Sequence, residues 1–335
     1  MRRKIMENIT TNEKKQLISE ALKEIEKKFG RESVMLLGEN DDTVVETFSS
    51  GSYKLNKILG INGFPKGRII EIYGPESSGK TTISLHAIAE IQKQGGIAAF
   101  IDAEHSIDRT YASNIGVNVN DLIISQPDSG EQALEIVDIL AKNGNIDLIV
   151  VDSVAALVPE SELNGDMRDQ QIGTQARLMS KALRKITASL NKNKTTVIFI
   201  NQIREKVGVV FGNPETTSGG RALKFYSSIR LEVRKGTNIS EGKDLIGNEI
   251  KFKVVKNKLS APYQIAESEI IYSKGIDSLG ELIDLCVDLN IIEKRGSWYS
   301  YKDQKLAQGR KSLKDYLNEN QEIFKEIEKE FLTSF

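Results

Sequence analysis

One short stretch constrains the fold of this chain more than any other feature. The apolar run Arg68-Ile-Ile-Glu-Ile-Tyr73 is followed by a loop that begins and ends with glycine. The pattern predicts a buried strand, a loop whose backbone N–H groups point inward, and a helix whose positive end faces the loop. A polyphosphate fits such a concavity. We therefore predict a phosphate site made of nine consecutive residues: Gly74, Pro75, Glu76, Ser77, Ser78, Gly79, Lys80, Thr81 and Thr82.

The alternative interpretation is a glycine-rich turn before an ordinary helix. The context disfavours it, because a β-branched run precedes the loop and Ile83 to Ile91 is apolar at helical spacing after it. In this context Lys80 is expected to reach the β and γ phosphates of a nucleotide, and the Thr81 hydroxyl to be a ligand of Mg²⁺.

The composition is that of an ordinary globular chain and excludes several kinds of site. Cys286 is the only cysteine among 335 residues, which rules out an intrachain disulfide and a thiolate cluster. His86 and His105 are the only histidines and do not make a zinc site, so any metal should arrive with the nucleotide. No apolar run approaches the roughly 20 residues that span a bilayer, and the start lacks a signal-peptide core, so we expect a cytoplasmic protein.

From Gly51 onward, strand-like and helix-like segments alternate. This order predicts an α/β fold with a mostly parallel central sheet covered on both faces. After residue 220 the apolar period changes to two, which predicts antiparallel strands that extend the sheet. The predicted strands are 95–101, 146–151, 195–200, 228–234, 249–256 and 263–272, and the predicted helices are 130–142 and 170–191.

The two ends of the chain differ from this core. Apolar residues at helical spacing predict a one-sided amphipathic helix at 8–30, followed by short strands at 33–37 and 43–48. From about residue 277 we expect a small α/β region with a helix through Leu289, a hairpin at 298–301 and one charged terminal helix to about 331.

Polar residues stand where the predicted parallel strands end. Ligands bind at the carboxyl ends of such strands, and these ends carry Asp102 and Glu104, Asp152, and Asn201 and Gln202. Asp152 closes four consecutive apolar residues, the pattern of a strand whose acid holds the Mg²⁺ shell opposite Thr81. An acid that caps a helix is the alternative.

A carboxylate past the neighbouring strand is a candidate general base for the water that attacks the γ phosphate. Glu104 is favoured about two to one over Asp102, and the sequence alone leaves both open.

Gln202 stands at the root of a long irregular segment, residues 203–220. An amide there could respond to the γ phosphate and change the order of the segment, although a surface loop without function is the alternative.

The net charge is −1, so nucleic-acid binding would need a local basic face. Lys251 and Lys253 share one face of a predicted strand, and lysines that protect a sheet edge are the simpler explanation. The residues alone support a P-loop ATPase with a possible nucleic-acid face.

A resemblance extends this interpretation. Six motifs occur in the order and at the spacing of the bacterial RecA recombinase family of P-loop ATPases, and they span nearly the whole chain: Gly74 to Thr82, Ile101 to His105, Val150 to Leu157, Phe199 to Arg204, Phe211 to Thr217 and Lys253 to Lys258. The resemblance implies an ATP- and Mg²⁺-dependent helical filament of this chain on single-stranded DNA. Such a filament pairs with homologous double-stranded DNA, exchanges strands, and stimulates self-cleavage of an SOS repressor. A ring helicase and a single-strand coat protein with a regulatory ATP site are the rival hypotheses.

The resemblance also assigns roles to residues. It implies that Glu104 is the base, that Gln202 senses the γ phosphate, and that Lys256 and Lys258 reach the ATP of a neighbouring copy. The adenine would be held by Asp108, Tyr111 and Tyr272. The implied DNA-binding residues are Ile172, Arg177, Ser180, Arg184, Arg204, Val207, Gly219 and Gly220 for the primary strand, and Arg234, Lys235, Lys251 and Lys253 for the incoming duplex.

The resemblance implies three domains as well. These are an oligomerisation helix and strand at 1–50, the ATPase core with its DNA loops at 51–277, and a small C-terminal α/β domain at 278–335.

Two features depart from the family pattern. No long acidic tail precedes the end at Phe335, so we do not expect autoinhibition by one, and the first DNA loop, Asn164 to Ile172, differs in composition.

Overall fold

The structure, a computed structural model, describes residues 11–30, 33–34, 45–166, 173–205, 212 and 214–334. The chain divides into two compact units, Met1–Val45 and Glu46–Phe335. In the first unit helix α1 spans Thr11–Phe29, which confirms the predicted amphipathic helix over its described part. The strand predicted at 33–37 lies mostly outside the described residues.

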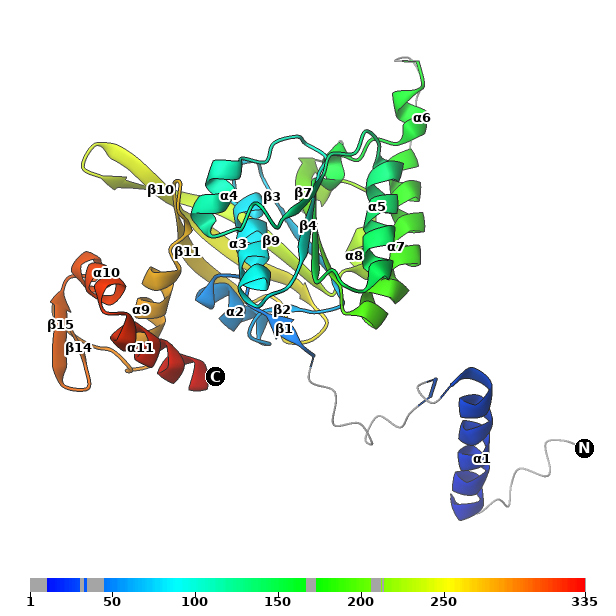
Figure 1. Ribbon diagram of the computed structural model, residues 1–335, viewed down its shortest axis with the longest axis horizontal. Coiled ribbons are helices and arrows are strands. Elements are labelled where there is room, and N and C mark those ends of the chain that lie inside the picture. Colours follow the sequence, from blue (N-terminus) through cyan, green and yellow to red (C-terminus); the bar gives the residue numbers. More distant parts are fainter. Residues whose placement is uncertain are drawn as a thin grey trace, which may run out of the picture. The chain divides into compact units, whose positions relative to one another are not determined.

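A large mixed sheet forms the centre of the second unit (Figure 1). Within the described residues its order is β12-β11-β10-β9-β3-β7-β6-β4-β5, with β8 paired to β7. The strands from β9 to β5 in this order run parallel to one another, which confirms the predicted mostly parallel sheet. These parallel strands are β3 (Ile69–Gly74), β4 (Ala98–Asp102), β5 (Ile123–Ser125), β6 (Leu148–Asp152), β7 (Thr196–Glu205) and β9 (Ile229–Glu241).

Helices cover both faces of this sheet because alternate strand residues point to opposite sides. Val150 belongs to the core beneath α3, whereas its neighbour Val151 belongs to the core beneath α5 and α7. Figure 1 shows α3 and α4 on one face and α5 and α7 on the other. The core helices are α2 (Tyr53–Leu59), α3 (Lys80–Lys93), α4 (Arg109–Ile115), α5 (Gly130–Asn143), α6 (Glu160–Leu163), α7 (Thr174–Asn193) and α8 (Ala222–Tyr226), with the strand pair β1 (Thr47–Phe48) and β2 (Phe64–Pro65) beside them.

The antiparallel extension differs from its prediction in one respect. Its first strand, β9, pairs parallel with β3 and so belongs to the parallel part of the sheet. The strands β10 (Asp244–Asn257), β11 (Ile265–Ile271) and β12 (Gly275–Ile276) then follow in antiparallel order. No helix in the described part of the chain is long and apolar enough to cross a bilayer.

Strand β7 is longer than the predicted strand 195–200. It continues to Glu205 and pairs antiparallel with β8 (Glu215–Thr217), with Ile203 opposite Thr217. The segment 203–220, which we expected to be irregular, therefore begins and ends in a short two-stranded ladder. Gln202 is half-buried and lies within β7, whereas we expected it to follow the end of the strand.

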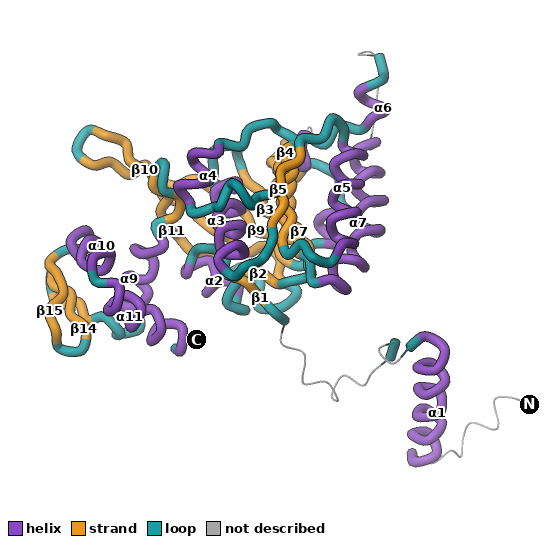
Figure 2. Tube along the Cα trace, viewed as in Figure 1, coloured by secondary structure: helices purple, strands orange, loops and turns teal. Residues whose placement is uncertain are grey.

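The C-terminal part has its own small hydrophobic core, and Figure 2 shows the helices and strands that form this part. Helix α9 (Ser278–Asp288) precedes three antiparallel strands, β13 (Glu293–Arg295), β14 (Trp298–Tyr301) and β15 (Gln304–Gln308). The single terminal helix that we predicted is wrong, because α10 (Arg310–Glu319) and α11 (Gln321–Thr333) are separated at Asn320, whose ψ of 71° is not helical. The buried Glu281 of α9 accepts a hydrogen bond from Ser52 Oγ over 2.8 Å, which ties this part to the start of α2.

Candidate functional site

Two glycines give the loop between β3 and α3 its close packing. A Cβ atom at Gly74 would lie 2.0 Å from the backbone oxygen of Val233 on β9, so no side chain fits there. Gly79, immediately before α3, has a φ of 95°, and a Cβ atom there would lie 2.5 Å from the Ile270 side chain. The loop therefore adopts the left-handed backbone that glycine permits, at the amino end of a helix of 14 residues.

The interior of this loop suits an anion. Ser78 Oγ is a buried polar atom with no hydrogen-bond partner among the described residues. Lys80 Nζ donates to the Pro75 oxygen over 2.6 Å, which keeps the ammonium over the loop. Burial lowers the pKa of Lys80 and the neighbouring Asp152 opposes this shift. Partly desolvated donors at a helix amino end fit a polyphosphate.

The hydroxyl of Thr81 meets the carboxylate at the end of β6. Thr81 Oγ1 donates to Asp152 Oδ2 over 2.7 Å, and Asp152 is only 4% exposed. Burial and, to a smaller extent, the nearby Glu104 raise the pKa of Asp152 to about 6, although the hydrogen bond from Thr81 opposes the shift. A hydroxyl oxygen and a carboxylate oxygen at this spacing are hard donors that fit Mg²⁺.

The two candidate bases have different surroundings. Asp102 is fully buried and accepts from Ser106 N over 3.0 Å and Gln126 Nε2 over 3.1 Å, so it holds the loop after β4 in place. Glu104 is exposed, accepts a hydrogen bond from Ser153 Oγ, and also accepts from Gln202 Nε2 over 3.0 Å. A base must reach a water, and only Glu104 of the two is open to solvent.

A pocket of about 240 Å³ adjoins the loop and could hold a nucleoside base. It is lined by residues of the loop together with Tyr111, Asn248, Ile270 and Tyr272. The hydroxyls of Thr82 and Tyr111 are 2.9 Å apart. Asp108 caps α4 by accepting from Thr110 N over 2.8 Å. The structure thus brings Tyr111 and Tyr272 to one pocket, while the Asp108 carboxylate is engaged with the backbone of α4.

Lys256, near the end of β10, and Lys258, just after the strand, lie elsewhere. Lys256 Nζ donates to the Lys224 oxygen over 2.6 Å, and Lys258 Nζ donates to the Phe225 oxygen over 3.3 Å, so both meet the last carbonyls of α8. Burial, with Lys258 close by, lowers the pKa of Lys256 to about 8.

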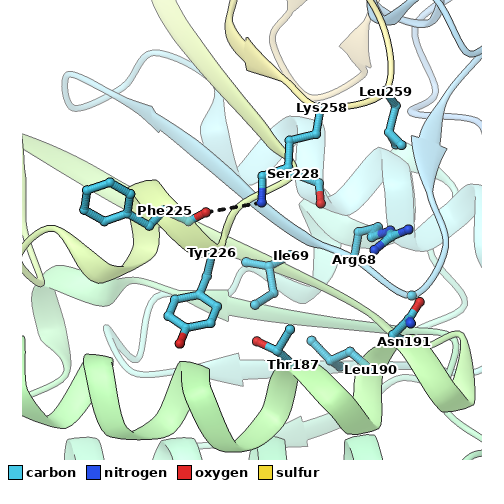
Figure 3. A pocket seen from close by; sticks show the side chains of 11 residues that line it. Arg68, Ile69, Thr187, Leu190, Asn191, Phe225, Tyr226, Ser228, Lys258 and Leu259 are labelled. Atoms are coloured by element: carbon cyan, nitrogen blue, oxygen red, sulfur yellow. Dashed lines mark hydrogen bonds between the residues drawn. The ribbon is translucent and has the colours of Figure 1, made fainter. Parts of the chain in front are cut away.

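Figure 3 shows Lys258 at a larger pocket, of about 420 Å³, beside Arg68 and Ile69. Those two residues stand where β3 begins, whereas the phosphate loop follows the other end of the strand. At about 3.3 Å per residue, Ile69 and Gly74 are separated by about 17 Å.

Comparisons with known proteins agree over nearly the whole chain. Models described as the RecA N-terminal domain and the RecA C-terminal domain match residues 16–277 and 280–335. The chain is 68% identical over 310 residues to Protein RecA of Mycoplasmopsis pulmonis (strain UAB CTIP), covering 92% of this chain and 91% of that protein. It is 64% identical over 324 residues to Protein RecA of Mesomycoplasma hyopneumoniae (strain 7448), covering 97% and 96%, and 58% identical over 318 residues to Protein RecA of Listeria ivanovii, covering 95% and 91%.

The chain belongs to the RecA family. It is accordingly a DNA-dependent ATPase of DNA recombination and repair.

The described residues that the RecA resemblance assigns to the primary DNA strand lie around α7 and around the second DNA loop, which the resemblance places at about Ile203 to Ser218. Arg177, Ser180 and Arg184 follow one another at helical spacing, away from the buried residues of α7. Arg204 is exposed on β7 opposite Thr216. Ile172 and Val207 lie outside the described residues.

Gly219 and Gly220 pack against the start of α7. Both have positive φ, and Cβ atoms at these positions would lie 2.7 Å from Val154 and 2.6 Å from Ala176. Gln175 connects the same elements, because its side-chain oxygen accepts from Gly219 N over 3.2 Å and its nitrogen donates to Val154 O over 2.8 Å. Nothing in its sequence context marked Gln175, and Ser153 could have been found only through its position next to Asp152.

Two of the basic residues that the resemblance assigns to the duplex, Lys251 and Arg234, are paired with acids. Lys251 stands opposite Arg234 on the outer face of the hairpin, and Lys251 Nζ lies 3.0 Å from Glu267 Oε1. Arg234 forms ion pairs with Glu215 and Glu232. Lys253 is half-buried on the same face of β10, and Lys235 is exposed on β9. The face is therefore one of mixed charge.

Proposed function

We propose that this RecA-family chain hydrolyses ATP at the loop between β3 and α3 with Glu104 as the general base. The observation that carries this assignment is the position of Glu104 between Ser153 and the amide of Gln202. Gln202 reports the γ phosphate, and Lys80 with the loop N–H groups from Gly74 to Thr82 binds the polyphosphate. The adenine occupies the pocket of Tyr111 and Tyr272, beside the α4 cap at Asp108.

Mg²⁺ belongs to this proposal, held by Thr81 and Asp152. When bound, the ion neutralises charge that develops on the phosphates during transfer. The chain contributes the fixed position of the Thr81 hydroxyl against a buried carboxylate.

A second copy of the chain completes the site. The strand registers place Lys256 level with Glu71, and Lys258 lies beside the start of β3, so neither stands at the phosphate loop of its own chain, and both serve the ATP of the next subunit. An ATP between two copies then stabilises a head-to-tail helical filament. The apolar stripe of α1, in the proposed domain 1–50, is the other docking element, and 51–277 and 278–335 are the proposed core and C-terminal domains.

The DNA is held on the side of the second loop. Arg177, Ser180, Arg184, Arg204, Gly219 and Gly220, together with Ile172 and Val207, bind the primary strand, and Arg234, Lys235, Lys251 and Lys253 take the incoming duplex. Because β7 carries both Gln202 and the first residues of that loop, nucleotide state and DNA binding are coupled through one strand. The filament also stimulates cleavage of an SOS repressor and works in the cytoplasm, where the chromosome is.

Strand exchange tests this function directly. A circular single strand and a linear homologous duplex are incubated with the protein and either ATP or an analogue that is not hydrolysed. We expect exchange of strands with both nucleotides. Unwinding without exchange would favour a ring helicase, and single-strand binding without either activity would favour a coat protein.

A further inference from the structure

A carboxylate without solvent exposure lies three residues before the phosphate loop. Glu71 on β3 is 0% exposed, and each of its oxygens has a different partner. Oε1 accepts from Asn201 Nδ2 of β7 over 3.0 Å, and Oε2 accepts from Arg230 Nε of β9 over 2.5 Å. The Arg230 guanidinium also stacks 4.6 Å from the centre of the Tyr73 ring. Glu71 thus joins three neighbouring strands through side chains.

The stability of the sheet does not account for this ion pair. Desolvation of two charges offsets most of their attraction, and apolar replacement of a buried pair is often neutral or stabilising. Ile69, two residues away on the same face of β3, is buried in the apolar core and shows that apolar side chains pack well on this side of the strand. The pair is therefore better explained by the geometry that it imposes on its partners.

Asn201 is the partner that leads to the active site. Its Nδ2 donates to Ser218 O over 3.0 Å as well as to Glu71, and its Oδ1 accepts from Gln202 N over 2.9 Å. Ser218 ends the second DNA loop, and Gln202 contacts Glu104. One amide therefore contacts both the nucleotide sensor and the end of the DNA loop, and Glu71 sets its orientation.

We propose that Glu71 is a positioning residue that orients Asn201, so that single-stranded DNA at the second loop and the Gln202 side chain change position together. The inference rests on the proposed roles of Gln202 and of that loop. Glu71 does not contact the nucleotide or the DNA. Its contribution is to the stimulation of ATP hydrolysis by DNA.

Two matched double variants test this role. Glu71→Leu with Arg230→Met removes both charges and leaves Asn201 Nδ2 with Ser218 O but without its carboxylate acceptor. Glu71→Gln with Arg230→Met also removes both charges but retains a carbonyl oxygen for Asn201. The measurements are the thermal midpoint, the Kd of a fluorescent ATP analogue without DNA, and kcat with and without single-stranded DNA.

We expect the leucine variant to lose DNA-stimulated kcat by about tenfold to a hundredfold, the effect of a misplaced active-site group. Its Kd for the fluorescent ATP analogue should stay within about twofold of the wild-type value, because the interactions that bind the nucleotide in the ground state are unchanged. The glutamine variant should keep most of the stimulation. Equal stimulation in both variants, or equal loss in both, overturns the role of Glu71 toward Asn201.

Two further measurements complete the design. If the leucine variant does not fold, Asn201→Ala removes the donor while leaving the ion pair, and undiminished stimulation in that variant overturns the inference. A wild-type protein whose hydrolysis does not respond to DNA would instead contradict the proposed function, so the two failures are distinguishable.

Discussion

The side-chain amide of Gln202 donates to Glu104 over 3.0 Å, which joins β7 to the turn after β4, although these two strands are not neighbours in the sheet. The strand between them, β6, supplies Asp152, which Thr81 contacts from the first turn of α3. The residues that we propose for hydrolysis, metal binding and sensing of the nucleotide thus lie at one edge of the sheet. The predictions below separate these roles.

Glu104→Gln should reduce ATP hydrolysis by about a hundredfold to ten-thousandfold, the usual contribution of a general base. Binding of ATP and assembly on single-stranded DNA should persist. Steady-state hydrolysis and a filter-binding assay check this. The control is Asp102→Asn, which should lower the thermal midpoint because Asp102 holds the loop after β4. Rapid turnover by the Glu104 variant would remove it as the base.

Lys80→Ala should abolish nucleotide binding, because no other side chain of the described loop places an ammonium over the phosphates. Equilibrium titration with a fluorescent ATP analogue measures the effect. Lys93→Ala, an exposed lysine in the last turn of the same helix, is the matched control and should bind normally. Equal affinity in the two variants would contradict the assignment.

Lys256 and Lys258 should act on the ATP of a neighbouring copy. A Lys256→Ala/Lys258→Ala chain and a Lys80→Ala chain should each be inactive alone. An equal mixture should regain up to about a quarter of wild-type hydrolysis, since a quarter of random head-to-tail junctions combine an intact loop with intact lysines. Co-assembly, measured by cross-linking, without recovery of hydrolysis would show that the lysines act within one chain.

Replacing Lys251 and Lys253 by alanine should weaken duplex binding more than single-strand binding. If both lysines contact phosphates, the slope of log K against log salt for duplex should fall by about two. Exposed lysines outside this face, Lys93 and Lys192, provide the control pair. An equal loss for single strands and duplex would make the two residues general phosphate contacts.

His86 should make the folded state sensitive to acid. Its Nε2 accepts from Ile276 N over 2.8 Å, and burial lowers its pKa to about 4 from an ordinary value of 6.5. The unfolded chain therefore takes up the proton first, so stability is complete above pH 6.5 and falls as the pH decreases toward 4. The loss should reach about 3 kcal/mol.

Chemical denaturation between pH 7 and pH 4 measures this loss. His86→Gln keeps an acceptor for Ile276 N but does not titrate, so its unfolding free energy should vary less with pH. The exposed His105→Gln is the control and should behave as wild type. Identical pH profiles for wild type and His86→Gln would exclude His86 as the cause.

The local order of elements followed from sequence alone. Apolar runs at Ile69 and Leu148, each ending in a polar or glycine-rich turn, predicted strands whose alternate residues face opposite cores, because side chains in a strand alternate by geometry. The glycine spacing predicted the phosphate loop, because only glycine tolerates the contacts at Gly74 and Gly79. Family motifs then supplied the function.

Only the tertiary structure decided which side chains meet. The residues alone favoured Glu104 over Asp102 but left both open as the base, and it is burial of Asp102 and exposure of Glu104 that distinguish them. The length of β7 depended on pairing with β8, and the contacts of Glu71 with Asn201 and Arg230 depended on β3 lying between strands more than a hundred residues away. The spacing of apolar residues in the sequence predicts which face of its own helix or strand a residue occupies. The order of the strands in the sheet, in contrast, results from packing of the whole chain.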